Sequence, residues 1–433
     1  MSARAWAAAA LLAFAAVRAH AGAMATCGDA FIFQEARVNV VVLPYDYFVP
    51  EHASFSKTGQ GLSLLVQMNT LNAILKYEQV GAIALVRTSP NDLSCQPDRV
   101  WKTLMSQAGA HGNGVVMVWG RIFEDGPQIY EQTFVRFARG GKSEEKWSLT
   151  ARDRAFDGVL SSQSTAFPAQ TLSASDLERI ASLISRYAVL RSAPDDTAPG
   201  RPLRDDLAKC LGCVDPGRPL SYVIIGEKNG WQHIRNLTGE EGWLKLDTGF
   251  GSGPLAAKMP EMSFIEVAVG FLQSRMVEGE RRTTYARTAD EALSKYVKNT
   301  EREEPPTASV MATEMRALMA GARKDAEGAD RAVALLGETL AISPADAEAH
   351  NLLALAKLNR WAAAKKPESQ SQIVQEFVSA SVLDPSGSRA LTNLKSFLEI
   401  AGDESLSDRL SNDDAKAQLA LVNSILAKRA PTR

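Results

Sequence analysis

The cysteine pair Cys210 and Cys213 is the arrangement in this sequence that comes nearest to a reactive site. Two cysteines with two residues between them can be redox-active where a helix follows a strand, because the helix end lowers the pKa of a thiol. Here the flanking residues 205–209 and 214–217 have the composition of a loop. The context favours a structural clip, and a thiol–disulfide oxidoreductase that uses Cys210 and Cys213 stays as the alternative.

The chain has four cysteines, the other two being Cys27 and Cys95. An even number favours disulfides outside the cytoplasm, and four cysteines allow three pairings. We expect Cys27 to pair with Cys95 and Cys210 with Cys213. Because only one pair is close in sequence, we expect no zinc site.

Other catalytic patterns are missing from the sequence. No two histidines have the spacing of metal ligands, and neither a His-Glu-x-x-His nor a Gly-x-Ser-x-Gly motif is present. The glycines of 249–253 are followed by Pro254, which breaks a dinucleotide-binding pattern. We therefore expect no catalytic residue, no metal and no cofactor.

The 433 residues carry a formal charge of −2 and a pI near 6.3. This length suggests several domains. No strong positive field is available to bind nucleic acid, so we expect no nucleic-acid partner.

The first 21 residues have the features of a cleaved signal peptide. Arg4 precedes an apolar run from Ala5 to Val17, and Ala19–Ala21 is a small-residue cleavage site. The run 259–277 is interrupted by charges, so we expect no transmembrane segment in the mature chain. These features predict a periplasmic protein. A lipid anchor on Cys27 is an alternative, although the residues before it form a poor lipidation motif.

Residues 27–186 have the pattern of an α/β domain. A helix is expected over Leu64–Leu75, because Leu64, Met68, Leu71 and Leu75 share one face. A second is expected to begin at Pro97, since proline is favoured in the first helical turn. A third is expected from Ser175, which can cap its start, to Tyr187. Strands are expected at 38–44, 80–86, 114–123, 128–139 and around 146–151.

The early Val42-Leu43-Pro44 strand and the apolar strand from Gly114 to Gly120 are similar to the N-terminal domains of Tol-system and curli-secretion proteins of bacteria. This resemblance implies an α/β sandwich with a structural or assembly role.

Residues 187–250 contain short apolar strands separated by Asn-Gly and Thr-Gly turns, the pattern of a small barrel. The segments Val189–Pro194, Asn229–Trp231 and Gly239–Leu244 resemble the bacterial SH3-like domain. That resemblance implies a β-barrel that binds a peptide. The segment 195–219 is longer than in this family, and we interpret it as an inserted loop.

Four residues of this region are the candidate ligand-binding residues. Trp231 and Trp243 follow glycine turns and are expected in the barrel core. The functional alternative is that one of them keeps an exposed edge and, with Tyr222 or Arg191, stacks on a peptide or a sugar.

The remaining residues are predicted to be helical, as a connector at 258–300 and a repeat region at 308–428. Two segments within the repeat region align, each with a helix that ends before a proline, Pro344 or Pro385, and is followed by a second helix. The motif around residues 342–352 resembles the tetratricopeptide repeat, and about two and a half to three degenerate repeats fit. Unrelated helical hairpins are the alternative. Stacked helix pairs of this kind leave a concave surface for a partner.

The sequence thus predicts a multi-domain α+β protein, with an α/β sandwich, an SH3-like barrel and tetratricopeptide-like repeats. We interpret it as a non-catalytic periplasmic adaptor. Its expected partners are a periplasmic protein or a peptidoglycan peptide. A lipid-anchored component of a secretion system is a further alternative.

Overall fold

The structure is a computed structural model, and its described residues form two compact units. Unit 1 contains Met1–Lys142 and Gln163–Glu303, and unit 2 contains Ser143–Ser162 and Glu304–Arg433. Unit 1 is mostly sheet and unit 2 is mostly helical, so the chain is a mixed α and β protein. The structure describes residues 25–48, 74, 77–87, 92–125, 128–142, 144–161, 164–173, 175–176, 189–202, 221–237, 239–245, 260–300, 306–323, 325–364, 370–401 and 412–429.

Several predicted segments lie outside these ranges. They are the signal peptide 1–21, nearly all of the helices expected over Leu64–Leu75 and Ser175–Tyr187, and most of the inserted loop 195–219. These stay predictions.

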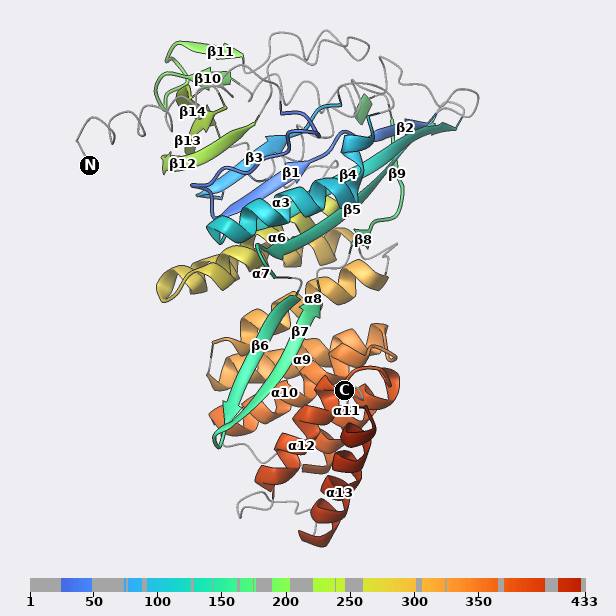
Figure 1. The fold of residues 1–433 in the computed structure, drawn as a ribbon. Helices are drawn as coiled ribbons and strands as arrows, with labels where there is room; N and C mark the ends of the chain where they lie inside the picture. Colours follow the sequence, from blue (N-terminus) through green and yellow to red (C-terminus); the bar gives the residue numbers. More distant parts are fainter. Residues whose placement is uncertain are drawn as a thin grey trace, which may run out of the picture. The chain divides into compact units, whose positions relative to one another are not determined.

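Three parallel strands form the centre of the sheet in unit 1 (Figure 1). β1 (Val38–Val42) lies between β3 (Val80–Ala84) and β4 (Gly114–Asp125) and pairs with both in parallel. All residues of β1 and β3 are buried, because a parallel strand inside a sheet is covered on both faces. The apolar runs in the sequence predicted these three strands correctly.

Asn39 is the polar exception within β1. Its Oδ1 accepts a hydrogen bond from the Phe33 amide at 2.9 Å, and its Nδ2 donates to the Phe33 carbonyl at 3.2 Å. The residue beside it on β3 is Gly81, where a Cβ would lie 2.3 Å from Asn39 Oδ1. Glycine at this position therefore makes room for the amide that satisfies the Phe33 backbone.

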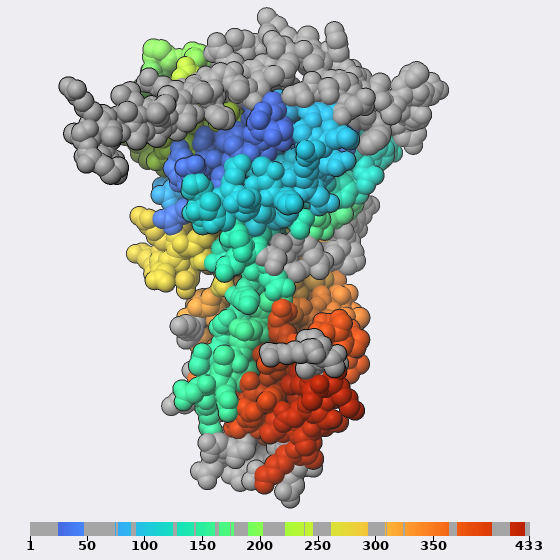
Figure 2. Space-filling view, in the orientation of Figure 1, coloured from blue at the N-terminus to red at the C-terminus, as the bar shows by residue number. Residues whose placement is uncertain are grey.

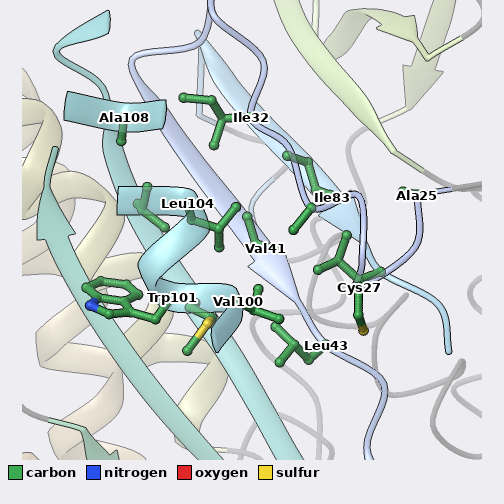
Figure 3. Close-up of a cluster of buried hydrophobic side chains, with 14 of the residues drawn as sticks. Ala25, Cys27, Ile32, Val41, Leu43, Ile83, Val100, Trp101, Leu104 and Ala108 are labelled. Carbon is green, nitrogen blue, oxygen red and sulfur yellow. The ribbon is translucent and has the colours of Figure 1, made fainter. Parts of the chain in front are cut away.

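Helix α3 (Pro97–His111) covers one face of the sheet. It begins with proline, as predicted, and is followed by Gly112, whose φ of 73° glycine adopts without strain. Leu104 of this helix belongs to one buried apolar cluster with Val41 and Ile83 of the two neighbouring strands (Figure 3). The 3-10 turn η1 (Leu93–Cys95) precedes the helix.

Helix α6 (Pro260–Met276) covers the opposite face. A Cβ on Gly114 would lie 3.2 Å from both Val38 and Leu272, which places α6 on the face of Val38. Val41, three residues further along β1, belongs to the α3 cluster on the other face. The helix predicted from Met259 is therefore part of the core of unit 1.

Helix α7 (Glu280–Thr300) packs along α6. The two helices approach closely at Gly270, where a Cβ would lie 2.8 Å from the Cβ of Ala289. The prediction placed a shorter helix here, from Ala289 to Lys298.

Antiparallel strands complete the sheet beyond β4. β5 (Gln128–Arg139) pairs with β4 along its whole length, as the predicted turn between them requires. The short strands β8 (Thr165–Ala166) and β9 (Gln170–Leu172) pair with β5, and β2 (Asp46–Phe48) pairs with the end of β4.

Five strands continue the same sheet on the other side of β3. Their order from the edge is β11, β10, β14, β13 and β12, and β12 pairs with β3. Closure of this region into a separate SH3-like barrel stays a prediction. Residues 200–202, expected within the inserted loop, instead form an edge strand, because they pair with β10. The bounds are β10 Val189–Arg191, β11 Gly200–Pro202, β12 Tyr222–Lys228, β13 Trp231–Asn236 and β14 Glu241–Lys245.

Unit 2 consists of successive helices and one β-hairpin. The helices before Pro344 and Pro385 end two residues before each proline, as predicted. The hairpin turns at Arg152 and Asp153, both with positive φ, and only its first strand was predicted. The bounds are β6 Glu144–Ala151, β7 Arg154–Ser161, α8 Pro306–Gly321, α9 Ala326–Ile342, α10 Ala347–Ala364, α11 Gln370–Leu383, α12 Arg389–Ala401 and α13 Asn412–Arg429.

Candidate functional site

The predicted ligand-binding residues lie on the strands of unit 1 beyond β3. Arg191 of β10 is directly opposite Trp243 of β14, and Trp243 is directly opposite His233 of β13. Residues opposite one another project from the same face of a sheet, so these three side chains form one row. The rings of His233 and Trp243 are stacked, with centroids 4.6 Å apart and an interplanar angle of 15°.

Hydrogen bonds and ion pairs border this row. Glu241 Oε2 lies 3.5 Å from His233 Nε2, and Glu241 Oε1 accepts a hydrogen bond from Arg235 Nε at 2.9 Å. Arg191 Nη1 donates to the Ala198 carbonyl at 2.8 Å. The row therefore combines a flat aromatic surface with polar groups at its border, which suits binding.

The other two predicted residues are placed differently. Trp231 is buried, two residues before His233 on the same strand. Tyr222 is also buried, and its position in the β12–β13 register directs it to the opposite face. Burial raises the pKa of the Tyr222 phenol above its usual range. The structure therefore brings together Arg191 and Trp243 and adds His233, whose role was not predicted.

Cys27 and Cys95 form a disulfide, in agreement with the predicted pairing. Both residues are buried and belong to the apolar cluster under α3, in which Figure 3 labels Cys27. The bond spans a sequence separation of 68 residues. Cys210 and Cys213 lie outside the described residues, so the redox alternative stays a prediction.

In unit 2 the β6–β7 hairpin packs against alternate helices of the repeat region. Strand β7 contacts α8, α10 and α12. Figure 2 shows the green hairpin lying along the orange and red helices. We call the surface that these three helices present to the hairpin the repeat groove. The three alternate helices therefore present one common surface to the hairpin.

Two asparagines of the repeat groove hold the backbone of Asp157 in β7. The Asp157 amide donates to Asn393 Oδ1 at 3.1 Å, and Asn393 Nδ2 donates to the Asp157 carbonyl at 2.7 Å. Asn351 Nδ2 donates to the same carbonyl at 3.2 Å. Asn393 Nδ2 also lies 2.9 Å from Asn351 Oδ1, which keeps the two amides together. These three hydrogen bonds join the asparagine side chains to the backbone amide and carbonyl of Asp157 and not to its carboxylate.

A charged group continues this contact along β7. Glu348 Oε1 accepts hydrogen bonds from the Val159 amide at 2.9 Å and from Asn351 Nδ2 at 2.8 Å. Arg389 joins Glu348 at 3.0 Å to Glu144 of the hairpin at 3.2 Å. Burial raises the pKa of the Glu348 carboxyl, and these hydrogen bonds and the Arg389 charge oppose that shift.

Shape complements the hydrogen bonds. Trp147 and Gly158 are opposite each other on the two strands of the hairpin. A Cβ on Gly158 would lie 2.4 Å from Leu352 Cδ2, and a Cβ on Gly321 would lie 2.3 Å from the indole of Trp147. One glycine on the hairpin and one in the repeat groove therefore allow close contact.

Sequence reasoning placed Asn351 and Asn393 within the aligned repeats but did not assign them a role. They are 42 residues apart, and each is followed by leucine. The signal available was an Asn-Leu pair that recurs near the same position of the two aligned segments, seven residues after Pro344 and eight after Pro385. The hairpin itself was missed because its turn pair, Arg152 and Asp153, lacks the glycine of the Asn-Gly, Asp-Gly and Gly-Gly pairs that usually mark such turns.

Unit 1 also contains a buried carboxyl pair, Glu131 on β5 and Glu261 on α6. Neither side chain is exposed. Thr133 donates a hydrogen bond to Glu131, and Tyr45 Oη lies 2.9 Å from Thr133 Oγ1. Burial raises the pKa of Glu131 to about 7 and raises that of Glu261. A general acid must reach a substrate, and these buried carboxyls are better explained as part of the core.

Among the described residues, no group of three or more His, Cys, Asp or Glu side chains is placed to hold a metal ion. The described helices include none with the length and apolar character needed to cross a membrane. Comparison of the chain with family models, with curated proteins and with solved structures gives no match.

Proposed function

We propose that this chain is a periplasmic adaptor protein without catalytic activity, and that its ligand surface is the row of Arg191, His233 and Trp243. The observation that carries this proposal is the stacking of His233 and Trp243 in one row with Arg191. In the same proposal the repeat helices have a structural role, because they hold the β6–β7 hairpin through Asn351 and Asn393.

The chemistry of the row on unit 1 suits a ligand surface. A stacked indole and imidazole present a large rigid surface, and the bordering Arg235 and Glu241 can orient a polar ligand. Within the proposal, this row corresponds to the ligand surface of an SH3-like domain. The ligand that we propose is a peptide, either in a periplasmic protein or in peptidoglycan.

The proposal is tested by capture of ligands with the full mature chain. The immobilised protein is incubated separately with periplasmic extract and with solubilised peptidoglycan, and retained molecules are identified by mass spectrometry. We expect a ligand that the wild type retains and that Trp243→Ala loses. Leu93→Ala is the matched control, because it removes a 65% exposed apolar side chain elsewhere in unit 1. The proposed role of the row is wrong if both variants retain the same molecules as the wild type.

A further inference from the structure

Strands β4 and β5 form a long ribbon whose two faces differ in accessibility. One face packs on α6, where the ring centroid of Phe137 lies 6.1 Å from that of Phe271. The other face packs on α3 as far as Arg136, whose guanidinium carbon lies 4.6 Å from the ring centroid of Trp101. Beyond that point the side chains of this second face are partly or fully accessible to solvent, whereas Glu131 on the α6 face stays buried.

The accessible part of the second face is rich in aromatic rings. We call it the aromatic strip, and it consists of the directly opposite pairs Trp119–Phe134, Arg121–Gln132 and Phe123–Tyr130. Opposite residues project from the same face of a sheet, so all six side chains lie on one surface. The two aromatic pairs are stacked, with centroids 5.7 Å and 5.2 Å apart. A group of partly accessible rings with polar neighbours is typical of a binding surface.

Arg121 is the one charged residue of the aromatic strip. It is exposed, and its guanidinium carbon lies 5.3 Å from the ring centroid of Phe134. Among the described residues it forms no ion pair, and its neighbour in the register, Asp46 of β2, pairs with Arg87 instead. The strip therefore presents a positive charge between two pairs of rings, which favours an anionic group on the ligand.

Both edges of the ribbon are already paired beside the aromatic strip. β2 pairs with residues 121–123 of β4, and β8 and β9 pair with β5 (Figure 1). An extended peptide that adds to a sheet gains its affinity from backbone hydrogen bonds to a free strand edge. On the face of the sheet its peptide groups would lose water without gaining these bonds. A peptide is therefore a poor ligand for this surface.

A sugar chain fits these groups better. One side of a pyranose ring carries C–H groups that can lie flat on an aromatic ring, while the hydroxyls at its edges stay in water. Gln132 donates from Nε2 to the Phe167 carbonyl at 3.0 Å, and its Oε1 can accept a hydrogen bond from a hydroxyl. The two aromatic pairs are four residues apart along each strand, about 13 Å, which is long enough for several linked sugars.

Single-stranded nucleic acid is the other ligand that uses stacked rings and arginine. Its backbone carries a charge at every nucleotide, and proteins that bind it supply several cations along the strand. The aromatic strip supplies Arg121 alone. One cation beside four rings suits a ligand whose charges are widely spaced.

We propose that the aromatic strip binds an acidic glycan, with sugar rings on the two aromatic pairs and a carboxylate at Arg121. This inference goes beyond the proposed function, because it concerns other strands than the row of Arg191, His233 and Trp243. Its ligand is a sugar chain and not a peptide, so neither proposal depends on the other.

Binding of two oligosaccharides to the full mature chain tests the proposal. The probes are a hyaluronan hexasaccharide, which carries a carboxylate on alternate sugars, and chitohexaose, which has the same length and no charge. Isothermal titration calorimetry measures the affinities, and saturation-transfer NMR shows which sugar protons contact the protein. We expect the hyaluronan probe to bind more tightly, with saturation of C–H protons on one side of the sugar rings.

Two variants separate the role of the rings from that of the charge. Phe123→Leu with Tyr130→Leu keeps apolar side chains but removes two flat rings, and should weaken both probes about tenfold. Arg121→Gln should weaken the hyaluronan probe about tenfold and leave chitohexaose unchanged. Tyr285→Leu and Arg287→Gln on α7 are the matched controls, and we expect both affinities to stay at the wild-type values.

The proposal is overturned if the wild type binds neither probe, or if Arg121→Gln binds the hyaluronan probe as tightly as the wild type does. It is also overturned if the wild type prefers an oligothymidylate to both sugars and the strip variants lose that binding. Because Arg121 is exposed, Arg121→Gln keeps the test valid even if the double leucine variant does not fold. The peptide ligand proposed for the row is tested separately, by capture with Trp243→Ala.

Discussion

The two units satisfy the backbone hydrogen-bonding groups at the edge of a β-strand in different ways. In unit 1 the edge of β3 is covered by another strand, β12, through backbone pairing of Tyr222 with Ala82 and Val223 with Gly81. In unit 2 the outer edge of β7 is covered by the side chains of Asn351, Asn393 and Glu348. Backbone pairing accepts almost any residue, whereas a side-chain clamp requires particular residues at particular positions.

This difference predicts where each unit is vulnerable. Unit 1 should depend on its buried core and on the Cys27–Cys95 cross-link, and single polar substitutions on its strands should matter less. Unit 2 should depend on a few polar side chains, because an unsatisfied buried peptide group is strongly destabilising. Amide hydrogen exchange reports on each unit separately in the full chain, so the variants below can be compared with one readout.

The largest effect is expected from loss of the disulfide. The bond closes a sequence separation of 68 residues, and the chain-entropy model gives about 4 kcal/mol for a loop of this length. Cys27→Ser with Cys95→Ser should lower the protection of β1 and α3 by about this amount and leave α10 and α12 unchanged. Equal loss of protection in both units would contradict the separation that we describe.

The next effect concerns the clamp. Asn393→Leu removes two bonds to the Asp157 backbone, and Asn351→Leu removes one. We expect losses of about 3 kcal/mol and about 1 kcal/mol in the stability of unit 2, since each unsatisfied buried peptide group costs on the order of 1–3 kcal/mol. Chemical denaturation followed by hydrogen exchange measures both. The account is wrong if the two variants destabilise unit 1 instead.

A pH effect is expected in unit 1. Burial raises the pKa of the Glu131 carboxyl from 4.5 to about 7 in the folded protein. The protonated carboxyl therefore contributes its full stabilisation below pH 4.5, which is the pKa in the unfolded chain. This stabilisation is lost as the pH rises toward 7, by about 1.4 kcal/mol per pH unit for one proton. Glu131→Gln cannot ionise and should flatten this part of the stability profile, measured from pH 5 to pH 8. A profile as steep as that of the wild type would rule out this role.

The smallest effect is expected at the border of the repeat groove. The Arg154 side chain is 53% exposed, and its ion pair with Glu399 is screened by solvent. Arg154→Ala should change the stability of unit 2 by less than about 0.5 kcal/mol. Thermal unfolding checks this, and a change as large as that of Asn393→Leu would show that charge, and not the backbone clamp, holds the hairpin.

The same contrast explains what could be predicted from the sequence. The strands β1, β3, β4 and β5 were found because continuous apolar runs are local signals. The pairing of β12 with β3 was not found, since it uses peptide groups that every residue has. The helices ending before Pro344 and Pro385 were found from their spacing and from the effect of proline on a helix.

The candidate site was harder to predict for a related reason. Trp243 and Arg191 were selected by residue type, but only the register of β10, β14 and β13 shows that His233 completes their row. The groove residues Asn351 and Asn393 gain their role from a hairpin about two hundred residues away. The recurrence of asparagine in the two aligned segments is a local signal, but it does not identify the hairpin as the partner.

The most direct test of the account is the exchange rate of two amides on the outer edge of β7. The N–H groups of Asp157 and Val159 donate to Asn393 and Glu348 and not to β6. We predict that both amides exchange as slowly as the core of α10 in the wild type, and that Asn393→Leu makes the Asp157 amide fast. Rapid exchange of both amides in the wild type would show that the repeat groove does not hold the strand, and it would contradict the central claim.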